Sequence, residues 1–177
     1  MYKKIKFITV AIYHRLLSKN KLAKLLGVKF GENCGFMTRG WGSEPYLIEM
    51  GHSVYTSSGV NFVTHDGSVY VIRHLYPEYK NVDIMGRIKI GNNVFIGMNA
   101  TILPGSIVGD NVIIGASSVV KGTLKSNSVY AGIPIKYICS LDEFIEKKKD
   151  SFDYTGDFNP QEKKAYFLNK FKIDKGE

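Results

Sequence analysis

Cysteine is scarce in this chain of 177 residues, which contains only Cys34 and Cys139. There is no CxxC pair and no cluster of cysteine with histidine, so the sequence predicts neither a disulfide scaffold nor a structural zinc site. Two isolated thiols are typical of a protein kept in a reducing compartment. We therefore expect a cytoplasmic protein without a bound metal.

Long hydrophobic runs are missing as well. The apolar run at residues 7–13 is far shorter than the roughly 20 residues that a membrane-spanning helix needs. It is followed by positive charge and not by a small-residue cleavage site, so we expect no signal peptide. The composition is nevertheless 44% hydrophobic and 12% aromatic, which excludes a disordered chain and favours one domain with a core.

Acidic residues are absent from residues 1–29, where seven lysines and one arginine account for the whole net charge of +8. A basic excess confined to one segment argues against a nucleic-acid groove along the protein. Apolar residues recur there at spacings of three and four, which predicts one face of a helix ending near Gly27: Ile5, Ile8, Ile12 and Leu16. Two interpretations stay open: a solvated cap on the fold, or weak association with an anionic membrane surface.

The middle of the chain repeats with a period of six. Aliphatic residues recur there without a slip, at Ile90, Ile96, Ile102, Val108, Ile114 and Val120. This period is neither the 3.6 of a helix nor the alternation of a hairpin. It fits a prism of short parallel strands in which three hexads make one coil. Each residue then stacks on the residue eighteen positions later, at the usual strand spacing of about 4.8 Å.

The six-residue phase breaks twice upstream of this region, at residues 37–46 and 64–84. The hexads between the two breaks keep the period but not the phase, at Met50, Thr56 and Phe62. Each break is predicted to be a loop that leaves the prism. His65 lies at the start of the second loop, and loops held by a rigid scaffold often carry function.

These hexads, together with the closing "YAGIPIKYI" at residues 130–138, resemble the hexapeptide-repeat acyltransferases. In particular they resemble maltose- and galactoside-type sugar O-acetyltransferases of bacterial capsule or lipopolysaccharide biosynthesis. The resemblance implies a mainly β fold, a left-handed parallel β-helix over residues 30–138, and a homotrimer. Residues 1–29 would then form a helical cap. Residues 139–177 would form a helical extension, for which capping signals stand at Ser140 to Glu143 and at Asn159-Pro160.

The stretch "FVTHDG" followed by a long excursion resembles the place of the catalytic histidine in those enzymes. The resemblance implies that His65 is a general base, which takes the proton of an acceptor hydroxyl as that hydroxyl attacks the thioester of acetyl-CoA. No covalent enzyme intermediate is required. Adjacent side chains on an extended chain point apart, so Asp66 is expected at the acceptor sugar. A backbone carbonyl or a distant acid such as Glu44 is expected to orient the imidazole.

The resemblance also implies where acetyl-CoA binds. In the family, its pantetheine arm lies in a groove between two prisms and contacts backbone groups of successive coils. The matching positions are Gly97, Met98, Gly115, Ala116 and Ser117. Basic residues near the end of the coils meet the phosphates, and Lys121 and Lys136 are the candidates.

The acceptor site is expected in the two loops. In the first, Arg39, Trp41 and Glu44 suit a sugar, because aromatic faces stack on sugar rings and charged groups bond hydroxyls. Trp41 could equally plug the prism where the phase breaks. In the second, Arg73 and His74 are candidates, although His74 has an equal alternative as a solvated loop residue.

Other functions compete with this one. The γ-type carbonic anhydrases share the fold, but the spacing of His52, His65 and His74 does not match their zinc ligands. An amino-sugar N-acetyltransferase stays open because the same base serves both acceptors. A non-catalytic scaffold or carbohydrate-binding protein is the alternative outside enzymes. The acceptor class is a saccharide or a nucleotide- or lipid-linked sugar, with no nucleic-acid partner expected.

Overall fold

The computed structural model describes residues 17–173. The chain divides into a larger unit that ends at Phe144 and a smaller unit that begins at Ile145. Among the described residues, no helix is both long enough and apolar enough to cross a membrane. The larger unit contains every candidate site residue.

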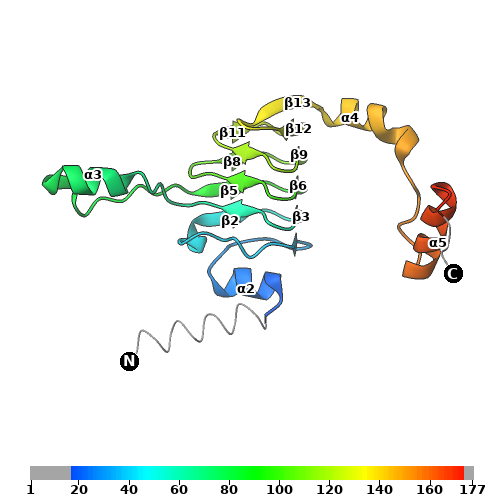
Figure 1. Ribbon diagram of the computed structural model, residues 1–177, viewed down its shortest axis with the longest axis horizontal. Coiled ribbons are helices and arrows are strands. Elements are labelled where there is room, and N and C mark those ends of the chain that lie inside the picture. The colour runs from blue at the N-terminus through cyan, green and yellow to red at the C-terminus, as the bar shows by residue number, and fades with distance from the viewer. Residues whose placement is uncertain (1–16, 174–177) are drawn as a thin grey trace. The chain divides into compact units, whose positions relative to one another are not determined.

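The larger unit is a prism with three sheets for sides (Figure 1). All strand pairs in it are parallel except β12 with β13. The six-stranded sheet contains β1 (Gly35–Phe36), β3 (Val54–Thr56), β6 (Val94–Ile96), β9 (Val112–Ile114), β12 (Ser128–Ala131) and β13 (Lys136–Ser140). The three-stranded sheet contains β4 (Asn61–Phe62), β7 (Thr101–Ile102) and β10 (Val119–Val120). The four-stranded sheet contains β2 (Ile48–Met50), β5 (Ile88–Ile90), β8 (Ile107–Val108) and β11 (Thr123–Leu124).

The registers between strands confirm the predicted stacking. Residues eighteen apart pair along each sheet, as in Ile90 with Val108, Ile96 with Ile114 and Ile102 with Val120. The upstream hexads pair with the same columns across the phase break: Met50 with Ile90, Thr56 with Ile96, Phe62 with Ile102. These side chains are at most 4% exposed and fill the axis. Strands of two to five residues are too short to be stable alone, so the stacked coils hold one another.

The chain turns three corners in each coil, and two of them contain candidate site residues. We call the turns at residues 97–100 and 115–118 the six–three corner, since they lead from the six-stranded to the three-stranded sheet. We call the turns at 103–106 and 121–122 the three–four corner, by the same rule. At the remaining corner, three asparagines with φ between 52° and 56° form a ladder of side-chain hydrogen bonds of 2.9 and 2.8 Å: Asn93, Asn111 and Asn127.

The first phase break does not leave the prism, so the prediction of a protruding loop there was wrong. Gly40 forms a parallel bridge with Asn61, and the short 3-10 helix η1 (Pro45–Leu47) leads back into β2. Trp41 points into the core, where it is 1% exposed and stacks on Phe62 with ring centroids 5.2 Å apart. Gly42 follows with φ +71°, and a Cβ there would lie 2.6 Å from the carbonyl oxygen of Phe62. The chain can therefore turn this tightly only with glycine.

The second phase break is the predicted protruding loop, and we call residues 66–85 the arm. Figure 1 shows it projecting from the side of the prism, with the helix α3 (Val69–Leu75) near its far end. The 3-10 helix η2 (Pro77–Tyr79) follows α3. Where the arm leaves the prism, two backbone hydrogen bonds of 2.8 Å join its two legs. The N–H of Asp66 donates to the carbonyl of Ile84, and the N–H of Gly86 donates to the carbonyl of Thr64.

The described part of the basic segment covers the first coil. The helix α2 (Lys19–Leu25) is capped by Ser18 at its N-terminus, and Gly27, with φ +94°, lies just beyond its C-terminus. The side-chain amide of Asn20 makes two hydrogen bonds with the backbone around β1. It donates to the carbonyl of Cys34 at 2.6 Å and accepts from the N–H of Phe36 at 3.1 Å. An edge strand that would otherwise be open is thus protected. The apolar face predicted from Ile5 to Leu16 lies outside the described residues.

Both predicted helix starts near the C-terminus are confirmed. The helix α4 (Leu141–Lys148) opens on a capping box in which Ser140 and Glu143 exchange hydrogen bonds of 2.8 and 3.1 Å. The short η3 (Lys149–Ser151) follows it. In the smaller unit, Asn159 caps α5 (Pro160–Lys170). There Asp153 accepts hydrogen bonds from Lys170 and Tyr166, and these lower the pKa of its carboxyl.

Candidate active site

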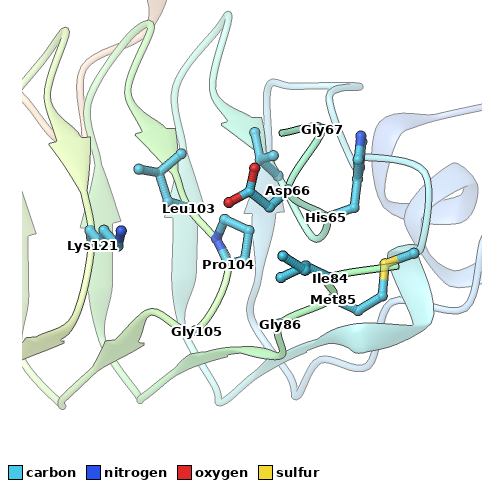
Figure 2. A pocket seen from close by; sticks show the side chains of 11 residues that line it. His65, Asp66, Gly67, Ile84, Met85, Gly86, Leu103, Pro104, Gly105 and Lys121 are labelled. Atoms are coloured by element: carbon cyan, nitrogen blue, oxygen red, sulfur yellow. The ribbon is translucent and has the colours of Figure 1, made fainter. Parts of the chain in front are cut away.

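A cavity of about 570 Å³ lies where the arm leaves the prism (Figure 2). His65 and Asp66 line it from one leg of the arm, and residues 84–86 line it from the other. The turn at residues 103–105 supplies the wall in the next coil, and Lys121 lies one coil beyond it. The cavity is therefore built along the three–four corner.

His65 is held at a fixed point because its neighbours belong to the prism. It comes shortly after β4, which ends at Phe62, and the preceding Thr64 is 0% exposed, with its carbonyl bonded to Gly86. His65 itself bridges Met85 on the returning leg. The side chain of His65 is 46% exposed, so its ring is anchored by the root of the arm and still open to a substrate.

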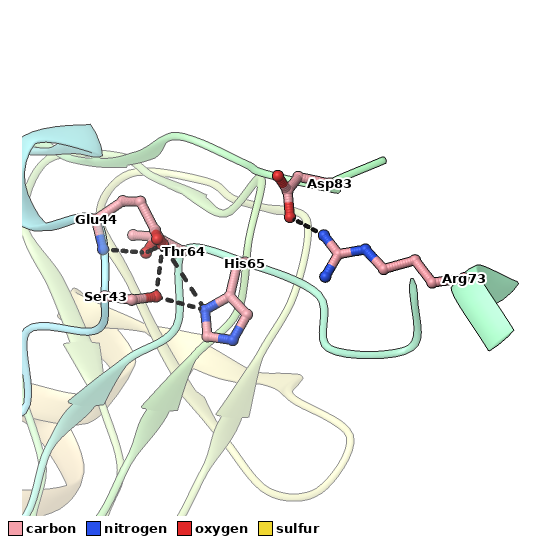
Figure 3. Close-up of polar contacts among 6 residues, drawn as sticks. All are labelled: Ser43, Glu44, Thr64, His65, Arg73 and Asp83. Carbon is pink, nitrogen blue, oxygen red and sulfur yellow. Dashed lines mark hydrogen bonds and ion pairs between the residues drawn. The ribbon is translucent and has the colours of Figure 1, made fainter. Parts of the chain in front are cut away.

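The imidazole of His65 lies next to Ser43 and Glu44, two residues of the first phase break (Figure 3). Its Nδ1 lies 2.8 Å from the hydroxyl oxygen of Ser43 and 3.7 Å from Oε2 of Glu44. The Ser43 hydroxyl also lies 2.6 Å from Oε2 of Glu44, and the Thr64 hydroxyl donates to the same oxygen at 2.9 Å. Glu44 thus stands behind the imidazole, which is one of the two positions expected for it. Ser43 was missed by sequence reasoning, and only its place next to Glu44 could have suggested it.

Asp66 lines the cavity beside His65, as its expected place at the acceptor requires. Its carboxylate accepts a hydrogen bond of 2.9 Å from the backbone N–H of Ser68. That bond is the main cause that lowers the pKa of Asp66, with a smaller contribution from the positive charge of Lys121. Asp66 is therefore ionised at neutral pH and offers an acceptor for hydroxyl protons.

The remaining acceptor candidates do not line this cavity. Arg39 donates to the carbonyl of Leu17 at 2.9 Å. Arg73 is tied within the arm to Asp83 and to the carbonyl of Val82, and Nδ1 of His74 lies 2.7 Å from the carbonyl oxygen of Tyr70.

Trp41 requires a correction. Its ring is enclosed between Phe36 and Phe62, so neither face is available to stack on a sugar. The alternative interpretation, a plug where the phase breaks, describes its position.

The residues expected to hold pantetheine lie at the other corner. The N–H of Ser117 donates to the carbonyl of Met98 at 2.7 Å, which stacks one turn of the six–three corner on the next. A Cβ on Gly97 would lie 2.5 Å from the backbone nitrogen of Ala116, so these turns can stack only with glycine there. Met98 is 53% exposed and can be approached from outside.

The two lysines expected at the phosphates lie in different places. Lys121 lines the His65 cavity at the three–four corner, whereas Lys136 is exposed on β13, which pairs with β12. The three-stranded sheet separates the cavity from the six–three corner within one chain. One chain therefore does not bring His65 and the expected pantetheine contacts to a common corner.

Comparisons with known proteins agree with this architecture. The family model described as "Bacterial transferase hexapeptide (six repeats)" matches residues 87–122. Protein CapG of Staphylococcus aureus is 46% identical over 171 residues, which cover 95% of this chain and 97% of that protein. The galactoside O-acetyltransferase of Escherichia coli K12 is 45% identical over 56 residues, 32% of this chain and 28% of that enzyme.

A solved structure has the same fold. The galactoside acetyltransferase in complex with coenzyme A superposes with a TM-score of 0.55 at 22% identity, covering 89% of this chain and 88% of that one. The predicted fold class, a mainly β left-handed parallel β-helix, is confirmed.

Proposed function

This chain belongs to the bacterial hexapeptide-repeat transferase family, and on that premise we propose that it transfers an acetyl group from acetyl-CoA to a hydroxyl of a saccharide. The observation that carries the proposal is the position of His65 and its surroundings. It stands at the root of the arm, lines a cavity of about 570 Å³ with Asp66 and Lys121, and is braced from behind by Ser43 and Glu44. A half-exposed imidazole with a fixed ring is what a general base requires.

The names of similar proteins support the donor and the acceptor class. A related enzyme is named a galactoside O-acetyltransferase, and a structural neighbour was solved with coenzyme A. The acceptor class is a saccharide or a nucleotide- or lipid-linked sugar. The protein is proposed to act in the cytoplasm, where acetyl-CoA is made.

The proposed reaction needs one base and no covalent enzyme intermediate. His65 takes the proton of the acceptor hydroxyl while the oxygen forms a bond to the carbonyl carbon of the thioester. When the resulting tetrahedral species collapses, the carbon–sulfur bond breaks and the thiolate leaves. The imidazolium of His65 returns the proton to that sulfur, so the products are an acetyl ester and free coenzyme A. Backbone N–H groups stabilise the oxyanion, and Asp66 positions the acceptor.

We propose a homotrimer as the active form, because one chain separates the two halves of the site. In a trimer, the six–three corner of one prism can face the His65 cavity of its neighbour and complete the groove for pantetheine. The six-stranded sheet also offers an apolar surface: Tyr55 and Phe95 are 45% and 41% exposed and stack with centroids 6.1 Å apart. Sedimentation is expected to show a trimer at assay concentration, and an active monomer would contradict this part of the proposal.

The test of function is release of coenzyme A thiol from acetyl-CoA across a panel of saccharides, nucleotide sugars and their amino-sugar counterparts. Thiol release that depends on a hydroxylated sugar supports the proposal. Release only with amino sugars would make the protein an N-acetyltransferase with the same base. If no acceptor supports release while the protein still binds sugar, it is a binding protein and not a transferase.

The basic segment at residues 1–29 is proposed to be a cap on the fold. The contacts of Asn20 with Cys34 and Phe36 support this for the described helix α2. The alternative is weak recruitment to an anionic membrane surface, where each lysine or arginine contributes roughly 1 kcal/mol. Co-sedimentation with liposomes at low salt decides between them. Equal amounts of protein on anionic and neutral vesicles would leave only the cap.

A further inference from the structure

We propose that Ser43 is a positioning residue for His65: its hydroxyl links the ring to Glu44 and keeps the proton of the neutral imidazole on Nδ1. The lone pair is then on Nε2, the nitrogen that Figure 3 shows pointing away from Ser43 and Glu44. The proposal rests on the proposed role of His65 as the base. It adds how the chain selects the tautomer in which that base can work.

The protons available around Ser43 determine the direction of its two short contacts. The Ser43 hydroxyl has one proton and lies close to two partners, Oε2 of Glu44 at 2.6 Å and Nδ1 of His65 at 2.8 Å. A carboxylate has no proton to give, so it can only accept. The serine proton therefore goes to Glu44, because otherwise two oxygens would face each other at 2.6 Å without a proton between them. The short contact to His65 is then a hydrogen bond only if Nδ1 donates it.

The position of Glu44 keeps the Ser43 hydroxyl donating to the carboxylate and not to the imidazole. Its side chain is only 18% exposed, and Oε2 also accepts from the hydroxyl of Thr64 at 2.9 Å. The backbone N–H of Glu44 donates to the same Thr64 oxygen at 3.3 Å, so backbone and side chain are fixed by one residue. Since Thr64 has used its proton on Glu44 and Ser43 does the same, both hydroxyls are oriented toward the carboxylate.

The hydroxyl is needed because the carboxylate does not reach the ring. Nδ1 lies 3.7 Å from Oε2 of Glu44, which is too long for an N–H···O hydrogen bond. Ser43 fills this gap and connects the negative charge to the ring. A carboxylate behind the imidazole stabilises the imidazolium that forms when Nε2 takes a proton, while a hydrogen bond at Nδ1 fixes the tautomer. Ser43 is itself exposed, so its role here is not packing.

The direct test is nitrogen NMR of the histidine rings in the full-length protein labelled with ¹⁵N-histidine, at alkaline pH where the rings are neutral. His65→Ala assigns the signals. In the wild type, Nδ1 of His65 is expected to show the shift of a protonated nitrogen and Nε2 that of an unprotonated one. In Ser43→Ala this preference is expected to be lost. Ser43→Thr keeps the hydroxyl on an exposed site and is expected to retain the wild-type pattern.

Kinetics give a second readout. Loss of a partner that orients a functional histidine costs about ten- to a hundredfold in rate, so kcat of Ser43→Ala is expected to fall by that factor with the KM for acetyl-CoA unchanged. Glu44→Gln is expected to fall similarly, because a neutral amide no longer fixes the direction of the serine proton. Ser43→Thr should stay within about threefold of wild type.

The two readouts separate the failure of this proposal from that of the proposed function. A wild-type ring protonated on Nε2, or a tautomer unaffected by Ser43→Ala, overturns the role of Ser43 even if the enzyme is active. If no saccharide supports thiol release but the tautomer follows the Ser43 variants as expected, the function fails and the linkage through Ser43 stands.

Discussion

The two breaks in the six-residue phase look alike in the sequence and do opposite things in the structure. At the first, residues 37–46, the chain stays within the prism: Gly40 pairs with Asn61 and Trp41 enters the core. At the second, the chain leaves the prism as the arm and returns twenty residues later beside the point where it left (Figure 1). A phase break therefore predicts an interruption of the regular hexads, but it does not predict whether the chain stays within the prism or leaves it.

The difference lies in which side chains the core can accept. Trp41 fills the axial column above Phe62, so a turn of irregular length still buries its apolar residue. The arm instead exposes its large apolar residues, among them Tyr70 at 68% and Leu75 at 65%. The first break thus contributes stability and the second contributes a cavity. His65 meets both, because Ser43 and Glu44 come from the first break and the histidine belongs to the root of the second.

The largest expected effect tests the stabilising role of the first break. Trp41→Ala removes a fully buried indole and leaves a cavity beside Phe36 and Phe62, which is expected to lower the free energy of unfolding by about 3–5 kcal/mol. Urea unfolding at a fixed protein concentration measures this change.

The matched substitution in the arm is Tyr70→Ala. Tyr70 is an exposed aromatic whose main neighbour is His74, with ring centroids 4.4 Å apart. The expected change in the free energy of unfolding is within about 0.5 kcal/mol. If both variants were destabilised equally, the arm would be part of the core and the comparison between the two breaks would fail.

The next effect tests the chemical role of the second break. His65→Ala is expected to lower kcat at least about a hundredfold, or about 2.7 kcal/mol of transition-state stabilisation, because the substitution removes the imidazole proposed to take the hydroxyl proton. Binding of acetyl-CoA, measured by calorimetry, should be unchanged. Turnover close to wild type would remove His65 from the mechanism.

The features of the fold and the site that could be predicted are those determined by residues close together in the sequence. The stacking of Ile96 on Ile114 follows from the period alone, since residues eighteen apart occupy one column. The protruding arm, with His65 at its root, was also predicted from the phase break and the resemblance. The capping box at Ser140 and the helix start at Asn159-Pro160 were predicted because such signals involve residues close together in the chain.

What could not be predicted depends on contacts between segments far apart in the chain. Ser43 reaches His65 across twenty-two residues, and nothing in the local pattern around Ser43 indicates such a partner. The burial of Trp41 depends on Gly42 adopting a positive φ, which a sequence permits but does not require. Lys121 was grouped with Lys136 by position in the sequence, yet the two lie on different parts of the prism.

That separation of the lysines gives the next prediction. Lys136→Ala is expected to raise the KM for acetyl-CoA about threefold to tenfold, which corresponds to the loss of about 1 kcal/mol from an exposed phosphate contact. Lys121→Ala is expected to raise the KM for the acceptor instead, because Lys121 lines the cavity of His65 and Asp66. Steady-state kinetics with each substrate varied in turn measures both. An effect of both variants on acetyl-CoA alone would return Lys121 to the phosphate site.

The smallest expected effect concerns the arm's own stiffness. The guanidinium of Arg73 on α3 bonds Asp83 and the carbonyl of Val82, so it ties α3 to the returning leg. Such a half-exposed ion pair contributes at most about 1 kcal/mol, and Arg73→Ala should leave the unfolding of the prism unchanged within that range. Hydrogen exchange should nevertheless accelerate at the arm amides, including those of Tyr76 and Val82, while the amides of β6 and β9 keep their protection.

The Arg73→Lys variant is the control for charge, because lysine keeps the positive charge but cannot bond both partners with one planar group. Faster exchange throughout the coils in Arg73→Ala would show that the arm and the prism open together, and the distinction between a break that stabilises the core and one that stands outside it would be lost.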